Sequence, residues 1–361
     1  MEAKETTVLP GVRLRGRGAA QNAAGRFEAS QRVAFEDGWD APDPRVLRTE
    51  VRLEVPRSAL SYNTSPDLPF DRSINPYRGC EHGCIYCYAR PSHAFLNLSP
   101  GLDFETRLIA RPGIGAVLDA ELRAKSYKVA VVAIGTNTDP YQPCEAEYRV
   151  MREILGVLSA HRHPVAITTK GSLIERDLDI LAPMAVAGLV RVGVSMTSLD
   201  ARLSRLMEPR APSPARRLQM IKALTDAGIA VRVMVAPVVP GLTDHEVEPI
   251  LAAARAAGAV AASYIALRLP REVSGMFQDW LALHYPDRAA KVMGRVRELH
   301  GGRDYDPAFG TRMRGTGIWA DLMRQRFDIA VARLGLAVRL PGLDCSQFAP
   351  PPRAGDQMRL F

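Results

Sequence analysis

Cysteine and aromatic residues are scarce in this chain, and it has no long apolar run. Its 361 residues include five cysteines, and 6% of them are aromatic. A small, odd number of cysteines in a chain of this length does not suit a disulfide framework. The most apolar stretch, residues 251–267, contains Arg255 and is shorter than the roughly 20 residues that span a membrane. We therefore expect no membrane association and, because no signal sequence is visible at the N-terminus, a cytoplasmic location.

Positive charge is in excess. Lysine and arginine total 47 against 39 acidic residues, which gives a net charge of +8 and would suit an anionic partner such as nucleic acid. Arginine is abundant throughout, so a compositional bias accounts for part of this excess. Residues 11–26 are more distinctive, because Arg13, Arg15, Arg17 and Arg26 occur there without any acid. This segment could be an arm that follows a phosphate backbone, or a tail that is unstructured or packed on the surface.

Three of the five cysteines, Cys80, Cys84 and Cys87, fall within eight residues. Three soft thiolates in one tight loop are typical of an iron–sulfur cluster. A [4Fe–4S] cluster has four irons, so three cysteines would leave one iron open to another ligand. The alternatives are a zinc ion held by these cysteines with His82, or redox-active thiols without a metal.

Strand and helix patterns alternate about every 30 residues from residue 70 onward, which predicts parallel βαβ units. The expected strands are 73–77, 128–135, 164–169, 189–196, 229–236 and 260–267, and the expected helices between them are 145–160, 175–186, 215–227 and 245–257. Six strands are too few for a closed eight-stranded barrel. We predict an α/β fold with a partial (β/α)6 TIM-like barrel at 61–270. It would be preceded by an irregular N-terminal extension at 1–60 and followed by a helical region and Pro-rich tail at 271–361.

Polar residues stand where three of these strands end. In parallel α/β folds the reactive groups gather at that edge of the sheet. The cysteine loop follows the first strand, so we expect it to share one mouth with the residues at 136–139, Thr169, Lys170, Ser195 and Thr197.

The cysteine spacing, with the aromatic Tyr86 before the third cysteine, resembles the signature of radical S-adenosylmethionine (SAM) enzymes. The resemblance covers roughly residues 70–270 and implies two cofactors, a [4Fe–4S] cluster and SAM. In that family the amino and carboxylate groups of SAM chelate the open iron. One electron then cleaves SAM to a 5′-deoxyadenosyl radical, which abstracts a hydrogen atom from the substrate.

Other segments are similar to the spore photoproduct lyase and DNA repair photolyase-like branch of that superfamily: 84–88, 135–140, 169–170, 194–195, 208–209, 217–218, 227–228 and 235–237. This resemblance implies that Thr138, Lys170 and Ser195 contact SAM and that Tyr86 belongs to the cofactor site. Tyr86 and Tyr88 correspond to relay tyrosines of the lyase, and Tyr88 is a catalytic candidate. For Thr138 and Ser195 the alternative is a hydroxyl that caps a helix.

One departure concerns the hydrogen-atom donor. The lyase uses a cysteine at the position of Thr136, and a threonine O–H bond is too strong for that role. Cys144 is a catalytic candidate to replace it, and an ordinary packed cysteine is the alternative. The departure counts against thymine-lesion repair but not against radical chemistry. The whole chain, including 16–19 and 25–27, resembles an uncharacterised bacterial subfamily of radical SAM proteins.

The last five residues, 357–361, resemble the peptide by which bacterial DNA polymerases and repair proteins dock on the sliding clamp. Gln357, Leu360 and Phe361 would make that contact, unless Leu360 and Phe361 pack on their own domain. The separate resemblance to radical SAM enzymes also implies a flavodoxin- or ferredoxin-type electron donor.

The leading hypothesis is a radical SAM enzyme that acts on nucleic acid, in lesion repair or nucleotide modification. One alternative is a radical SAM enzyme for a protein or small metabolite. Another is a non-catalytic iron–sulfur protein that binds nucleic acid.

Overall fold

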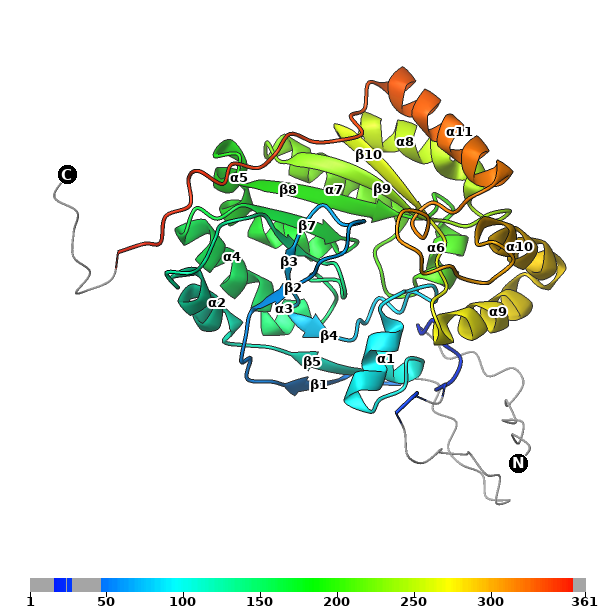
Figure 1. The fold of residues 1–361 in the computed structure, drawn as a ribbon, viewed down its shortest axis with the longest axis horizontal. Helices are drawn as coiled ribbons and strands as arrows, with labels where there is room; N and C mark the ends of the chain where they lie inside the picture. Colours follow the sequence, from blue (N-terminus) through cyan, green and yellow to red (C-terminus); the bar gives the residue numbers. More distant parts are fainter. Residues whose placement is uncertain (1–15, 24, 28–46, 353–361) are drawn as a thin grey trace, which may run out of the picture.

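A seven-stranded sheet organises this computed structural model, which describes residues 16–23, 25–27 and 47–352 (Figure 1). Its strand order is β10-β9-β8-β7-β6-β3-β2. The six parallel strands are β3 (Arg72–Ile74), β6 (Val132–Ile134), β7 (Val165–Thr169), β8 (Val190–Met196), β9 (Ala230–Val238) and β10 (Ala261–Ala266), and β2 (Leu60–Tyr62) joins β3 in antiparallel pairing. The partial barrel is confirmed, and among the described residues its edge strands β2 and β10 do not pair.

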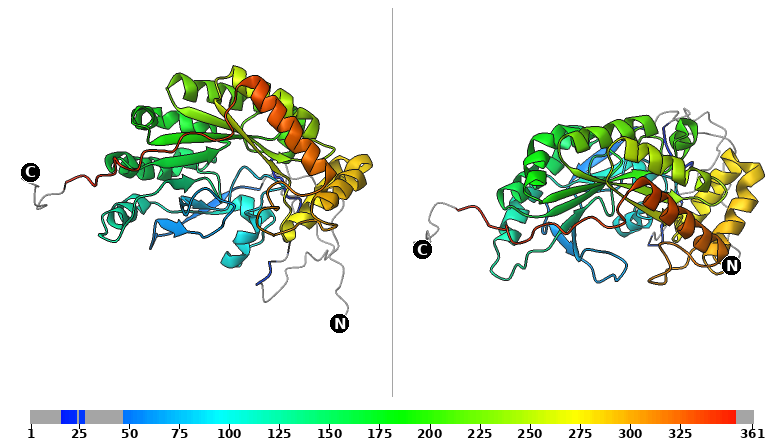
Figure 2. Two further views of the ribbon diagram at one scale, coloured as in Figure 1. Left: turned by 45° about the horizontal axis from the view of Figure 1, so that its top comes forward. Right: turned by 90° about the horizontal axis from the view of Figure 1, so that it is seen from above.

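Apolar residues on both faces explain the parallel sheet. In β8 every residue except Arg191 is buried, as expected for a strand covered on both sides. The helices lie on the outer face of the curved sheet (Figure 2). They are α4 (Val150–Ala160), α5 (Leu178–Val186), α6 (Ala201–Met207), α7 (Pro214–Asp226) and α8 (Val247–Ala256), with single 3₁₀ segments η2 (Ser172–Asp177) and η3 (Asp244–Glu246) before α5 and α8.

The helix expected at 145–160 is two helices. A short α3 (Glu145–Tyr148) ends at Arg149, whose φ of 52° is left-handed, and α4 then begins. The carboxylate of Glu145 accepts a hydrogen bond from Met151 N at 3.1 Å, so it satisfies one of the free amides in the first turn of α4. The apolar periodicity continues across this break, and therefore the sequence alone did not reveal it.

The sequence predicted an irregular extension at 1–60, but part of this region is ordered. Strand β1 (Glu50–Leu53) forms a second sheet with β5 (Arg107–Ala110) and β4 (Tyr77–Arg78). Along the chain, η1 (Arg90–Leu96) and α1 (Leu102–Thr106) precede β5, and α2 (Ile114–Leu122) follows it. Because β4 ends two residues before Cys80, this small sheet adjoins the cysteine loop.

The hypothesis of a phosphate-binding N-terminal arm is wrong for the two arginines that the structure describes. Arg17 is buried and donates to Glu105 O at 2.8 Å, and Arg26 forms an ion pair with Glu272 at 2.9 Å. Both guanidinium groups therefore serve internal contacts. Arg13 and Arg15 lie outside the described residues.

Helices α9 (Glu272–His284), α10 (Pro286–Leu299) and α11 (Ile318–Leu334) follow the sheet. After α11 the chain runs back along the edge where the parallel strands begin (Figure 1). We call this segment, residues 335–352, the C-terminal strap. Along it Asp344 N donates to Gly188 O at 3.2 Å and Ala349 N donates to His161 O at 3.0 Å. Gln357, Leu360 and Phe361 lie outside the described residues.

A polar bridge joins the two open edges of the sheet. Ala266 N at the end of β10 donates to Met313 O, and the neighbouring Arg312 forms an ion pair of 2.6 Å with Asp67, between β2 and β3. Gly310 N also donates to the Asp67 carboxylate at 2.8 Å. Segments more than 240 residues apart thus span the gap that strand pairing leaves open. No helix in the described part of the chain is long and apolar enough to cross a membrane.

Candidate functional site

The cysteine loop is a series of turns above the ends of the parallel strands. Cys80 N donates to Phe104 O at 2.8 Å, and Cys87 N donates to Cys84 O at 3.2 Å. Cys80 and Cys84 are buried, and Cys87 is partly exposed. The three thiols predicted to bind a cluster therefore share one structured loop.

The donor set fits a cluster better than either alternative. Within the described residues no three His, Cys, Asp or Glu side chains converge closely enough to hold a single metal ion, and His82 turns instead to Asp139, with 3.4 Å between Nδ1 and Oδ2. A multi-iron cluster takes one thiolate per iron, so its ligands need not meet at a point. Burial raises the pKa of Cys84 to about 12, which makes a poor free nucleophile but leaves a good ligand once iron displaces the proton.

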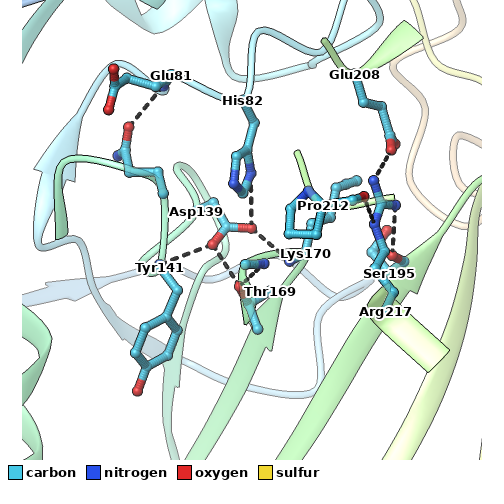
Figure 3. A network of polar contacts seen from close by, with 12 residues as sticks. Glu81, His82, Asp139, Tyr141, Thr169, Lys170, Ser195, Glu208, Pro212 and Arg217 are labelled. Carbon is cyan, nitrogen blue, oxygen red and sulfur yellow. Dashed lines mark hydrogen bonds and ion pairs between the residues drawn. The ribbon is translucent and has the colours of Figure 1, made fainter. Parts of the chain in front are cut away.

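Asp139, which follows β6, ties the cysteine loop to β7 (Figure 3). Its carboxylate faces His82 and accepts hydrogen bonds from Thr169 Oγ1 at 2.6 Å, Lys170 N at 2.7 Å and Tyr141 N at 2.9 Å. Burial by itself would raise the pKa of Asp139, but the nearby His82 and these donors lower it to about 2. A carboxylate that stays ionised can thus hold three segments of the mouth in place.

A second cluster surrounds the buried Glu208, and Figure 3 shows its contact with Arg217. This carboxylate accepts hydrogen bonds from Arg217 Nη2, Tyr86 OH and, at 2.8 Å, Thr197 Oγ1. Arg217 also donates to Ser195 O at 3.1 Å. The hydroxyl of Tyr86 is therefore engaged with the framework, and in the sequence this residue stands between the second and third cysteines of the loop.

Lys170 brings a positive charge next to the cysteine loop. Its Nζ lies 5.8 Å from the centre of the Tyr86 ring, and no carboxylate of the described residues forms an ion pair with it. Burial lowers the pKa of Lys170, but the charges of Cys84 and Glu208 outweigh this and raise it overall. A protonated amine without a carboxylate partner suits an anionic ligand group.

The hydroxyls of Thr138 and Ser195 are buried in the framework. Thr138 Oγ1 donates to Tyr77 O at 2.9 Å, and Ser195 Oγ donates to Ala236 O at 3.1 Å. The Ser195 bond links β8 to the neighbouring β9, whereas the Thr138 bond links the loop after β6 to β4 of the small sheet, and neither hydroxyl caps a helix. Each oxygen keeps acceptor capacity, so contact with SAM stays a prediction for both residues.

Tyr88 reaches across the mouth. Its hydroxyl donates to Thr136 O after β6, and the guanidinium carbon of Arg268, after β10, lies 4.5 Å from its ring centre. The side chain of Tyr88 is 46% exposed although its backbone lies in the cysteine loop. A half-exposed tyrosine beside an arginine therefore borders the opening above the cluster loop.

The two remaining cysteines lie elsewhere. Cys144 is buried at the start of α3 among the apolar residues of the main core, and burial raises its pKa. Its role as hydrogen-atom donor stays a prediction. Cys345 lies on the C-terminal strap, beside the hydrogen bond of Asp344 to Gly188, at the opposite edge of the sheet from the cysteine loop.

Two important arginines were missed from the sequence. Arg90, three residues after Cys87, is fully buried and donates to Cys84 O at 2.9 Å and to Gly83 O at 3.1 Å. Arg268 follows β10, so the rule that singled out the polar ends of the other strands would have found it. No comparable signal marks Arg90.

A cavity of about 690 Å³ lies on the far side of the cysteine loop. Ile85, between the second and third cysteines, forms part of its wall. The other walls come from 16–21, α6 and α9.

Comparison with known proteins identifies the family. The model of the radical SAM superfamily matches residues 74–254. An uncharacterized protein of Mycobacterium tuberculosis is 39% identical over 272 residues, which is 75% of this chain and 76% of the relative. The chain belongs to the radical SAM superfamily. It is therefore an enzyme, and the non-catalytic alternative is set aside. An uncharacterized protein of Methanocaldococcus jannaschii is 27% identical over 174 residues, 48% of this chain and 62% of that relative.

Solved structures agree on the fold of this radical SAM enzyme. Spore photoproduct lyase complexed with dinucleoside spore photoproduct has a TM-score of 0.57 and 16% identity, covering 80% of this chain and 81% of the lyase. A lyase mutant with bound AdoMet and dinucleoside spore photoproduct has a TM-score of 0.58 at the same identity and coverage. At this identity the likeness concerns the fold alone.

The cofactors of the superfamily are a [4Fe–4S] cluster and SAM, and the site suits both. Cys80, Cys84 and Cys87 would hold the cluster, and Lys170 would meet the carboxylate of SAM. When bound, the two cofactors supply one-electron cleavage of SAM to a carbon radical. The chain's own residues hold the loop through Asp139 and orient Tyr86 through its hydrogen bonds.

Proposed function

We propose that this radical SAM enzyme acts on nucleic acid, in lesion repair or nucleotide modification. The observation that carries the proposal is Arg268, which borders the mouth against the ring of Tyr88 and has no carboxylate partner among the ion pairs of the described residues. A guanidinium group pairs well with phosphate, and an aromatic face suits a base. The net charge of +8 and the lyase complex with a dinucleoside add support.

Replacing Arg268 with Gln should weaken binding of a single-stranded oligonucleotide about tenfold, because one charge-assisted phosphate contact is lost. The slope of log affinity against log salt should fall by about one. Fluorescence anisotropy of the reconstituted enzyme measures both quantities. Arg324→Gln is the matched control, since it removes the same charge from an exposed position on α11.

The second measurement is release of 5′-deoxyadenosine after anaerobic reduction with SAM, with and without the oligonucleotide. Stimulation by the oligonucleotide, reduced in Arg268→Gln, is the expected result. If wild-type enzyme releases 5′-deoxyadenosine but neither binds nor responds to DNA or RNA, the substrate is instead a protein or small metabolite.

The proposed reaction ends differently from that of the lyase. Thr136 stands where the lyase has its donor cysteine, and its carbonyl accepts a hydrogen bond from Tyr88. We propose Tyr88 as the residue that relays the radical after hydrogen abstraction, and Cys144 as the candidate hydrogen-atom donor. The one-electron reductant that radical SAM enzymes need would be a flavodoxin- or ferredoxin-type protein.

We further propose that the C-terminal residues dock on the bacterial sliding clamp. The strap supports this, because it brings the last described residues to the edge of the sheet opposite the mouth. A partner bound beyond it would leave Arg268 accessible. A peptide of residues 353–361 should bind the clamp saturably at tens of micromolar, and a peptide with Leu360 and Phe361 replaced by Ala should not. Equal binding of both peptides, or of neither, would refute the contact.

A further inference from the structure

The carboxylate of Glu105, in α1, connects the N-terminal segment to the cysteine loop. The side chain is completely buried. Its oxygens accept hydrogen bonds from Gly18 N and Ala19 N, both at 2.9 Å, and from Arg90 Nη2 at 2.5 Å. A buried carboxylate needs such partners, because an unpaired one would be strongly destabilising.

Arg90 carries this connection to the cluster ligands. A guanidinium group has five N–H donors, and all five are used here. They reach Glu105 and four backbone carbonyls, those of Gly83, Cys84, Pro100 and Gly101. The position of the Cys84 carbonyl therefore depends on Arg90, and that of Arg90 depends on Glu105.

Close backbone contact adds to these hydrogen bonds. A Cβ atom on Gly18 would lie 1.9 Å from Gly83 O, so only glycine allows the N-terminal segment to approach the loop this closely. Gly83 itself has a φ of 66° and directly precedes Cys84. The resemblance of residues 16–19 to a bacterial subfamily thus coincides with a site of tight packing.

A second connection reaches the first cysteine. Arg17 donates to Thr49 Oγ1 at 3.1 Å, and Thr49 Oγ1 donates to Glu81 at 2.7 Å. Glu81 follows Cys80 directly, and its amide donates to Gln142 at 2.8 Å. The backbone at or beside each of the two buried cysteines, Cys80 and Cys84, is therefore linked to residues 17–19.

We propose that residues 16–19 are a positioning element for the iron–sulfur cluster, acting through Glu105 on Arg90 and through Arg17 on Thr49 and Glu81. The element fixes the spacing of the thiols by holding the backbone of the loop in place. Solvent exposure and hydrogen bonding near the sulfurs set the stability and reduction potential of such clusters. The inference concerns the cluster alone and is independent of the substrate.

Glu105→Gln tests the proposal. Both carboxylate oxygens of Glu105 accept hydrogen bonds, so the NH2 group of glutamine would face an N–H donor and at least one of these bonds would be lost. The matched control is Glu121→Gln, since Glu121 likewise accepts from two consecutive amides, Ala59 N at 3.0 Å and Leu60 N at 2.9 Å, away from the cysteines. Each variant is reconstituted anaerobically. The measurements are iron per chain, the rate of iron loss to a chelator, and the electron paramagnetic resonance spectrum and midpoint potential of the reduced cluster.

Glu105→Gln should lose iron several-fold faster than wild type and show an altered spectrum and potential, while Glu121→Gln should match wild type in all four. Gly18→Ala perturbs the partner of Glu105 in the N-terminal segment and should shift the same measurements in the same direction. If Glu105→Gln fails to fold, Gly18→Ala is the variant that tests the proposal. Wild-type iron retention and spectra in a folded Glu105→Gln, or in Gly18→Ala, would overturn the proposal. No substrate enters these measurements, so their outcome is separate from that of the nucleic-acid proposal.

Discussion

Cys84→Ala should hold little or no [4Fe–4S] cluster and release no 5′-deoxyadenosine from SAM. Cys84 is the middle one of the three proposed ligands, and the described residues contain no group of three His, Cys, Asp or Glu side chains that could hold a metal ion in its place. An iron that loses its only protein ligand leaves a cluster held by two thiolates, which is readily lost. Iron content, thiolate-to-iron absorption and 5′-deoxyadenosine after reduction measure the effect.

Cys345→Ala is the control, because it removes a partly buried thiol from the opposite edge of the sheet. It should keep wild-type iron and SAM cleavage. Cys144→Ala should keep its iron too, and a selective loss of the substrate reaction in that variant would support the donor role of Cys144. Full iron loading in Cys84→Ala would refute the assignment of the cluster ligands.

The sequence revealed those parts of the site that depend on local pattern. Cys80, Cys84 and Cys87 are close in the chain, so their spacing alone predicts the ligand loop. Five of the six parallel strands are largely apolar runs, and β3 (Arg72–Ile74), although it starts with two polar residues, was expected at nearly the same place, so all six were found. Lys170 followed from the rule that polar groups gather where such strands end, and the structure places it beside the loop.

The parts that were missed depend on contacts between distant segments. Arg17 looked like a free basic residue, yet it is buried against the chain at Glu105, 88 residues away. Arg90 has ordinary neighbours in sequence, and only the fold shows that its donors hold the loop. Strand β1 is short and mostly exposed, so its partner β5 and not its own pattern defines it. Burial and pairing of this kind leave no local periodicity to detect.

Glu208→Gln should lower the free energy of unfolding by about 3–5 kcal/mol at pH 7, because it leaves the buried Arg217 without its counter-charge. The two side chains are 0% and 1% exposed. Chemical denaturation of wild type and variant measures the difference. The matched control is Glu175→Gln, which breaks the pair with the adjacent Arg216, where the side chains are 25% and 38% exposed. That exposed pair should contribute only about 0.2–1 kcal/mol. Equal effects of the two substitutions would contradict the view that Glu208 and Arg217 form a buried ion pair on which stability depends.

The same comparison has a predictable pH dependence. Burial by itself would raise the pKa of Glu208, but the charges of Arg217 and Lys170 lower it to about 2, below the value of about 4.3 expected in the unfolded chain. A carboxylate with a lowered pKa contributes its full stabilisation above the unfolded value and loses it as the pH falls toward the folded value. The difference between wild type and Glu208→Gln should therefore be constant from pH 7 to about pH 5 and shrink between about pH 4 and pH 2. Acid effects common to both proteins cancel in this difference. A difference that grew on acidification would mean that Glu208 is protonated in the folded enzyme. It would refute the ionised Glu208 that accepts hydrogen bonds from Arg217 and Tyr86.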